Sequence, residues 1–299
     1  MEEYDATSPL AIDGLTPGIK YEWQVQGLYN SEPTSTEWSN SAFFTTNEYL
    51  ELANDDSQAD ADGKNSAIIV AKAGKLADVK LANRTLYKDG DWNTLCLPFD
   101  VSTTTGPLSG DNVEAMVLRL SDSGLSGTTL KLNFDDAPET IPAGTPFIVK
   151  WDNTGVNITN PVFQSVTIDN CTEAIANNTQ TSDDGTVSFK GTYAWQEYTE
   201  ENQSILLLGT KNTLYWPKPD ANSNPSIGAC RAYFELSDGQ QARQFVLNFD
   251  SGETTAVFDL NNNEQIINNN WYTLDGRKLD SKPTQKGVYI NSGRKVVVK

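Results

Sequence analysis

The chain contains no histidine among its 299 residues. A Ser-His-Asp triad and a Cys-His pair both use an imidazole as general base, so neither can form here. Metal sites that depend on histidine ligands are excluded for the same reason. Carboxylate catalysis, Ser-Lys catalysis and binding without catalysis remain open.

Basic residues are scarce. Lys and Arg total 22 against 40 Asp and Glu, so the formal net charge is −18 at pH 7. Nucleic-acid binding depends on clustered Lys and Arg that neutralise phosphates, and anionic lipid surfaces attract the same residues. We therefore expect neither nucleic acid nor an anionic membrane surface as a partner.

Long hydrophobic runs are also missing. The longest clean apolar stretch is the segment 66–71 (SAIIVA), whereas a spanning helix needs about 20 apolar residues. We expect no membrane-spanning segment. The chain begins with Met1, Glu2 and Glu3, and this start is acidic, whereas a signal peptide begins with basic residues. A mature exported protein would also lack a signal peptide, so its absence does not argue for the cytosol.

Cysteine is rare as well. Cys96, Cys171 and Cys230 form no CxxC pair, which excludes zinc ribbons and dithiol redox motifs. An odd number permits at most one intrachain disulfide. Cys96 and Cys230 lie in strand-like runs, and buried free thiols are favoured over a disulfide between them. We expect no cofactor and no bound metal.

What the chain does contain is a hydrophobic pattern of period two. Leu130, Leu132 and Phe134 alternate with polar neighbours, as half-buried strands do. Asp-Gly pairs between such segments suit tight turns. The same alternation recurs in the segments 147–151, 187–190 and 245–249.

Many short strands without interleaved long helices predict an all-β fold, with an antiparallel β-sandwich as the main domain. Only the segments 48–53 and 172–177 are expected to form one or two helical turns. Composition divides the chain into four zones. These are a module fragment (1–46), an acidic linker (47–64), the sandwich domain (65–258), and an Asn-rich connector with a small β tail (259–299).

The first zone carries a Leu-x-Pro-x-x-x-Tyr pattern at Leu15, Pro17 and Tyr21. This spacing is typical of a tyrosine corner, in which a tyrosine hydroxyl bonds to backbone where the chain passes between sheets. Together with Trp38 and Phe43, the zone resembles the second half of a fibronectin type III module. The resemblance implies three strands of a module whose first strands are missing, with an apolar face that packs on the next domain or on a second copy. The next domain is favoured.

The middle of the chain resembles the β-rich modules of secreted, multidomain surface proteins of the Bacteroidetes. The resemblance rests on the segments 84–99 (RTLYKDGDWNTLCLPF), 142–148 (PAGTPFI), 160–163 (NPVF) and 231–234 (RAYF). It implies a secreted or outer-surface location and no particular activity.

The tail fits the same picture. Its segments 271–277, 286–290 and 294–299 look like a C-terminal sorting segment, which implies presentation to secretion or anchoring machinery. The region 271–299 holds seven of the 22 basic residues and two of the 40 acidic ones. It is shorter than a complete sorting domain, so a structural cap remains an alternative.

Exposed aromatic rings beside amide and carboxylate groups are suited to sugar binding, whereas aromatic rings more often fill a core. The candidate ligand-binding residues are Tyr193, Trp195, Tyr198, Tyr215 and Trp216. The alternative interpretation is that these rings pack in the sheets.

Paired carboxylates could instead make a glycan hydrolase. The candidate acids are Asp135, Asp136, Glu139, Glu197, Glu200 and Glu201. Solvated acidic loops are the favoured explanation for such clusters in so acidic a chain. The segments 56–63 and 259–264 resemble calcium loops but lack the EF-hand ligand pattern.

We therefore predict a secreted or cell-surface binding or adhesion module without catalytic residues, with a glycan or a host protein as ligand. A carboxylate-based glycan hydrolase and a structural spacer in a multidomain protein are the two alternatives.

Overall fold

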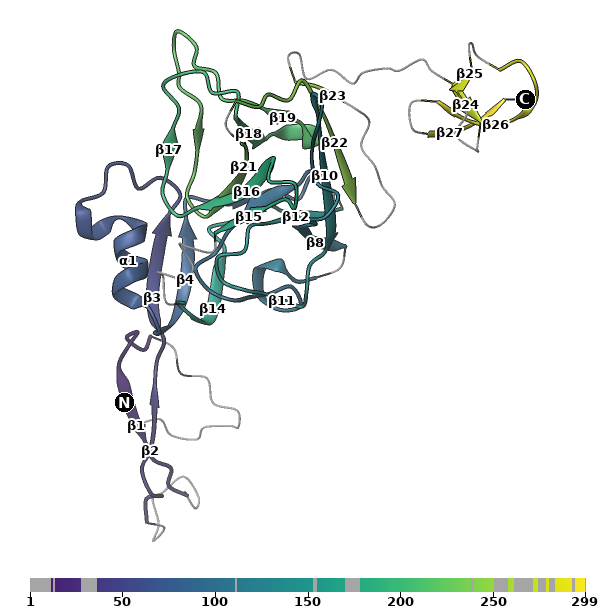
Figure 1. Cartoon of the computed structure of the whole chain (residues 1–299). Helices are drawn as coiled ribbons and strands as arrows, with labels where there is room; N and C mark the ends of the chain where they lie inside the picture. Colours follow the sequence, from purple (N-terminus) through teal and green to yellow (C-terminus); the bar gives the residue numbers. More distant parts are fainter. Residues whose placement is uncertain are drawn as a thin grey trace.

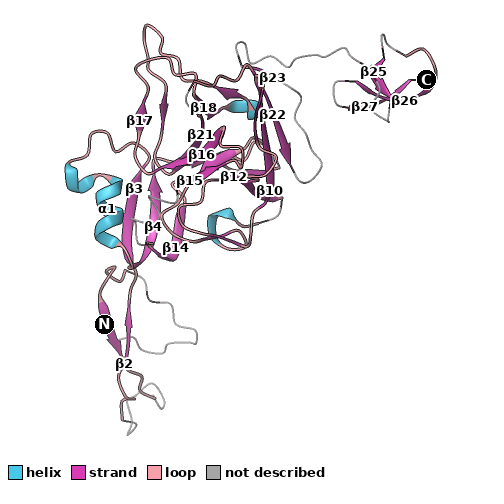
Figure 2. Cartoon of the chain, viewed as in Figure 1, coloured by secondary structure: helices cyan, strands magenta, loops and turns pink. Residues whose placement is uncertain are grey.

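The computed structural model is built from short strands, and the part of the chain that it describes contains one α-helix, α1 (Asn65–Lys72) (Figures 1 and 2). The all-β class predicted from the period-two pattern is confirmed. The described residues are 12, 14–27, 37–110, 112–152, 155–169, 178–237, 239–249, 258–260, 271–273, 278–279, 283–291 and 294–298.

A seven-stranded sheet forms the centre of the fold. Its strands follow the order β23-β22-β10-β8-β12-β6, and β9 pairs with β10 beside this path. The bounds are β6 (Asn93–Leu95), β8 (Val113–Leu118), β9 (Gly124–Ser126), β10 (Thr129–Asp136), β12 (Phe147–Trp151), β22 (Gln244–Phe249) and β23 (Phe258–Asp259).

A five-stranded sheet covers one face of the central sheet and completes the sandwich. Phe189 and Phe234 of this sheet stack with ring centroids 4.4 Å apart, and Phe134 of β10 meets each of them at 6.4 Å. All three rings are almost wholly buried. The strand order is β15 (Thr179–Thr181), β16 (Val187–Thr192), β21 (Arg231–Leu236), β18 (Ile205–Leu208) and β19 (Leu214–Tyr215).

A second core lies on the opposite face of the central sheet. A three-stranded sheet, β14 (Val162–Thr167), β4 (Leu76–Ala82) and β3 (Glu48–Ala53), supplies one wall, and α1 adds Ile69. The polar face of this small sheet is turned outward, where Lys80 and Glu51 form an ion pair of 2.7 Å.

Strand β12 takes part in both cores. Its residues Phe147, Val149 and Trp151 belong to the second core, while Ile148 belongs to the sandwich core. The alternation expected for this strand is therefore present, but both of its faces are buried. Lys150 is only 8% exposed. Its ammonium pairs with Glu114 at 3.2 Å and lies 5.0 Å from the centre of the Trp92 ring.

Two strand pairs are parallel, which the sequence did not predict. β10 pairs in parallel with β22 over six residues of each strand, and β3 pairs in parallel with β4. Parallel partners need a long connection between them. For β3 and β4 this connection contains α1, and for β10 and β22 it contains the whole five-stranded sheet.

The predicted helical turns at 48–53 are wrong, because this segment is β3. Leu50 and Leu52 face the core while Tyr49 and Glu51 face outward, the spacing of a strand. The zone assigned to a linker thus contributes a strand to a sheet and a nearly buried carboxylate, Asp56. The other expected helical segment, 172–177, lies outside the described residues.

Strands β1 (Lys20–Trp23) and β2 (Ala42–Thr45) form an antiparallel pair that leads into β3 (Figure 1). The backbone N–H of Thr16 donates a 2.7 Å hydrogen bond to the Tyr21 hydroxyl, the contact expected of a tyrosine corner. The apolar side chains here stay in solvent: Trp23 is 49% exposed and Trp38 is 56% exposed. The expected packing of this face on the next domain is thus not seen in the described residues.

The remaining elements are short. A separate four-stranded antiparallel sheet forms the tail. The order of its strands is β25 (Lys278–Leu279), β24 (Trp271–Thr273), β26 (Gly287–Asn291) and β27 (Arg294–Val298). Three further two-stranded pairs are β5 (Thr85–Leu86) with β13 (Ile158–Thr159), β7 (Val101–Ser102) with β11 (Thr140–Ile141), and β17 (Gln196–Glu197) with β20 (Ser226–Ile227).

The aromatic contacts in the sandwich core lead to a stability prediction. Phe134→Ala removes a ring that packs on three other phenylalanines, and we expect it to lower the free energy of unfolding by about 3–5 kcal/mol. Tyr87→Ala is the control, because Tyr87 is 51% exposed and should cost less than about 0.5 kcal/mol. Urea unfolding followed by tryptophan fluorescence measures both. Equal losses in the two variants would contradict the proposed core.

Candidate functional site

The five aromatic residues singled out in the sequence do not lie together. Tyr193 is 5% exposed and belongs to the second core, so its ring is not accessible to a ligand. The prediction that Tyr193 binds a ligand is therefore wrong. Trp195 is half-buried, and its backbone N–H donates to the Asp56 carboxylate at 3.0 Å.

Tyr215 and Trp216 point to opposite faces of the five-stranded sheet. The Trp216 ring packs against the sandwich core, whereas Tyr215 packs on the outer face. Successive side chains of an extended chain alternate in this way. The pair that looked like one aromatic patch in the sequence is therefore divided between the core and the surface.

Tyr198 and Tyr215 both lie on the outer-face side of the five-stranded sheet. They pack around a small cluster formed by Ile205, Leu207, Ile227 and Tyr233. We call these six residues the outer-face cluster. Tyr233 was missed in the sequence, although the alternation in the segment 231–236 places it on the face opposite Phe234.

Polar groups border the outer-face cluster. The Tyr198 hydroxyl donates to the Gln196 side-chain oxygen at 3.5 Å. Lys190, opposite Tyr233 on the neighbouring strand, forms an ion pair with Glu235. Loss of solvent raises the pKa of Tyr198, Tyr215 and Tyr233. All three hydroxyls therefore stay protonated at neutral pH and can donate hydrogen bonds.

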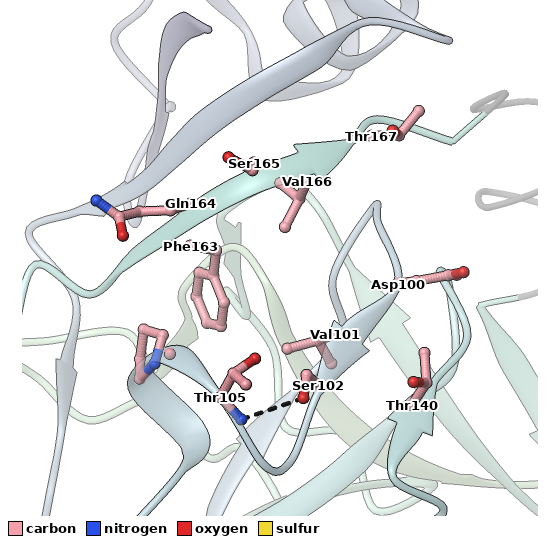
Figure 3. A pocket seen from close by; sticks show the side chains of 12 residues that line it. Asp100, Val101, Ser102, Thr105, Thr140, Phe163, Gln164, Ser165, Val166 and Thr167 are labelled. Carbon is pink, nitrogen blue, oxygen red and sulfur yellow. Dashed lines mark hydrogen bonds between the residues drawn. The ribbon is translucent and has the colours of Figure 1, made fainter.

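A shallow hollow of about 350 Å³ lies elsewhere, between β14, β7 and the turn that follows β7 (Figure 3). Phe163, Val101 and Val166 supply its apolar lining, and hydroxyl side chains border it. Its one carboxylate, Asp100, accepts a hydrogen bond from the Ala143 N–H at 2.9 Å. The Ser102 hydroxyl accepts the Thr105 N–H at 3.1 Å. The hollow thus holds one acid, and that acid already binds backbone.

The candidate catalytic acids are placed in different environments. Asp135 of β10 is paired with Arg119, the residue that follows β8. The pKa of Glu201 is lowered by hydrogen bonds from Gln203 and then from Lys218. Within the described ranges no cluster of three or more Asp, Glu or Cys side chains could hold a metal ion, and no helix there is long and apolar enough to cross a membrane.

The calcium-like segment 56–63 has a structural role. The two oxygens of Asp56 accept the backbone N–H groups of Asn65, at 3.2 Å, and Trp195, at 3.0 Å. This carboxylate joins the start of α1 to the loop after β16. The second calcium-like segment, 259–264, lies mostly outside the described residues.

Cys96 and Cys230 are buried free thiols, as the sequence favoured. The Cys96 backbone N–H donates to the Cys230 carbonyl at 3.3 Å, and the Cys96 thiol donates to the Tyr193 hydroxyl at 3.7 Å. A Cβ at position 191 would overlap the Cys96 sulfur, so Gly191 is what allows this packing. Burial raises the pKa of Cys96 to about 12 and raises that of Cys230 as well.

The raised thiol pKa leads to a prediction on reactivity. The thiolate is the reactive form of cysteine, so neither Cys96 nor Cys230 should be alkylated by iodoacetamide at pH 9 while the chain is folded. Peptide mapping by mass spectrometry measures this, with the same protein in denaturing urea as control. Native-state alkylation at the rate of a free thiol would contradict the buried assignment.

The same shift predicts a loss of stability in alkali. The folded state binds the Cys96 proton more tightly than the unfolded state, whose thiol pKa is about 9. The stabilisation is therefore complete below about pH 9 and decreases as the pH rises toward about 12. Unfolding midpoints in urea should fall over this range, and less steeply in Cys96→Ala. An identical slope in the variant would exclude Cys96 as a source.

Comparison with protein-family models, with curated proteins and with solved structures finds no match to this chain.

Proposed function

We propose that this chain is a non-catalytic binding module of a secreted or surface-displayed protein, and that the outer-face cluster binds a glycan. The observation that carries the proposal is the pair Tyr198 and Tyr215. Both are half-buried around Ile205 and Leu207 on the face of the five-stranded sheet opposite the sandwich core, where Ile227 of the pair β17–β20 also packs. Tyrosine offers an apolar ring face together with a hydroxyl, a combination frequent in binding surfaces.

The polar neighbours of these rings suit a sugar. The area contains the amide of Gln196, the carboxylate of Glu235 and the ammonium of Lys190. Each of these groups can form a hydrogen bond with a hydroxyl of a sugar ring. Ligand sites commonly combine a hydrophobic surface with a few polar groups of this kind. A host protein is the second ligand class for the same surface, because aromatic residues are also enriched in protein interfaces.

Secretion or surface display is supported by the resemblance of the segments 84–99, 142–148 and 271–299 to Bacteroidetes surface proteins. The hydrolase alternative needs two carboxylates that face each other across a cleft. In the hollow of Figure 3 Asp100 is the only carboxylate. A binding module is therefore favoured over the hydrolase.

A glycan array probed with the full chain tests the proposal. We expect a restricted set of sugars to bind, and Tyr198→Ala or Tyr215→Ala to weaken the best of them at least about tenfold, or about 1.4 kcal/mol. Tyr87→Ala is the matched control, since Tyr87 is an exposed tyrosine outside the cluster and should leave affinity unchanged.

The outcomes are distinct. A blank array rejects a glycan as the ligand. Binding that is retained in both cluster variants rejects the outer-face cluster as the site. Circular dichroism of each variant checks that lost binding does not come from lost folding.

A further inference from the structure

The segment 84–99, which resembles a surface-protein module, folds largely around itself. The Asn93 side-chain oxygen accepts the Tyr87 N–H at 2.9 Å, and its amide donates to the Tyr87 carbonyl at 2.9 Å. The Thr94 hydroxyl accepts the Ala232 N–H at 3.3 Å. The buried polar residues of the segment are thus hydrogen-bonded within the fold, with one exception.

The exception is Arg84, which is 1% exposed and one of the largest fully buried side chains. Its Nη2 donates to the Thr94 carbonyl at 3.1 Å. Its Nε and Nη1 are buried without an acceptor among the described residues. Among the described residues no carboxylate forms an ion pair with it. Most of the five N–H donors of this guanidinium therefore have no acceptor.

A buried guanidinium in this state is costly. Arginine stays charged in proteins, so it cannot avoid the penalty by losing its proton. Burying a charge without a counter-charge costs several kcal/mol, even after the surroundings relax. A water molecule would accept hydrogen bonds but would leave the charge uncompensated. Only an anion supplies both acceptors and neutralisation.

A second buried N–H donor also lacks an acceptor among the described residues. The Trp151 indole Nε1–H, 2% exposed and on the core-facing side of β12, is likewise buried without an acceptor. The Lys88 ammonium lies 5.3 Å from the centre of the Trp151 ring. Asn93 precedes Thr94, whose carbonyl Arg84 contacts, and the Asn93 side-chain oxygen already accepts the Tyr87 N–H. The described residues therefore supply Arg84 with no counter-charge, and its Nε and Nη1 remain without acceptors among them.

We propose that Arg84 binds a small monovalent anion, of the halide class, at its buried guanidinium beside β6, with its Nε and Nη1 as the principal donors. The anion completes the hydrogen bonding of the guanidinium and neutralises its charge. It acts as a structural ligand of the segment 84–99. This proposal is independent of glycan binding at the outer-face cluster.

Bromide is the probe, because it replaces chloride and scatters anomalously. Crystals of the full chain grown in bromide should give an anomalous peak within hydrogen-bond distance of Arg84 Nε and Nη1. A peak there supports the proposal. A difference peak at this position without anomalous signal means that water fills the site, and it overturns the proposal.

Thermal unfolding in chloride and in gluconate, at equal ionic strength, supplies the second readout. A ligand that binds only the folded state raises the midpoint with its concentration. Saturation a hundredfold above the dissociation constant should raise it by about 5–10 °C. Arg84→Met should abolish the difference between the two salts. Arg243→Met, a change of the same type at an exposed arginine, should keep it.

If Arg84→Met does not fold, the wild-type comparison decides. Equal midpoints in chloride and gluconate, even with a bromide peak present, mean an adventitious ion only and overturn a structural role. A chloride effect that persists unchanged in a folded Arg84→Met protein also overturns it.

Discussion

Burial of both faces of one short strand holds this fold together. β12 has five residues, and none of them is open to solvent. A sheet that is covered on one side needs only alternate apolar residues, but this strand must satisfy two different cores at once. Phe147 and Trp151 do so on one side and Ile148 on the other. Lys150 fits because Glu114 and the Trp92 ring receive its ammonium.

This arrangement decides where a ligand can bind. The central sheet is covered by the five-stranded sheet and, at its β6 end, by the three-stranded sheet, so most large aromatic rings are used for packing. On the outer face of the five-stranded sheet, Tyr198 and Tyr215 stay only half-buried. Arg84 is buried beside β6, where its charge needs a partner that the described residues do not supply.

Much of the fold could be predicted from the sequence, because alternation reports directly on strands. Phe134 and its neighbours follow this alternation. The hydroxyl contact of Tyr21 was predicted separately, from the Leu-x-Pro-x-x-x-Tyr spacing. Local patterns could not show that β3 pairs in parallel with β4, since the partner is set by long-range packing. Nor could they show that Tyr193 is inside and Tyr198 outside. Both tyrosines follow polar segments, so the local sequence does not distinguish them. Tyr193 is buried because it packs in the second core, whereas Tyr198 does not.

Hydrogen exchange of the full chain in increasing urea tests the shared strand most directly. If β12 couples the two cores, peptides from β12, from β4 and from β16 should lose protection at the same urea concentration and with the same free energy of opening. Loss of protection in β4 at a clearly lower urea concentration, with β12 and β16 still protected, would contradict the coupling. It would show that the second core is a separate unit that rests on an independently stable sandwich.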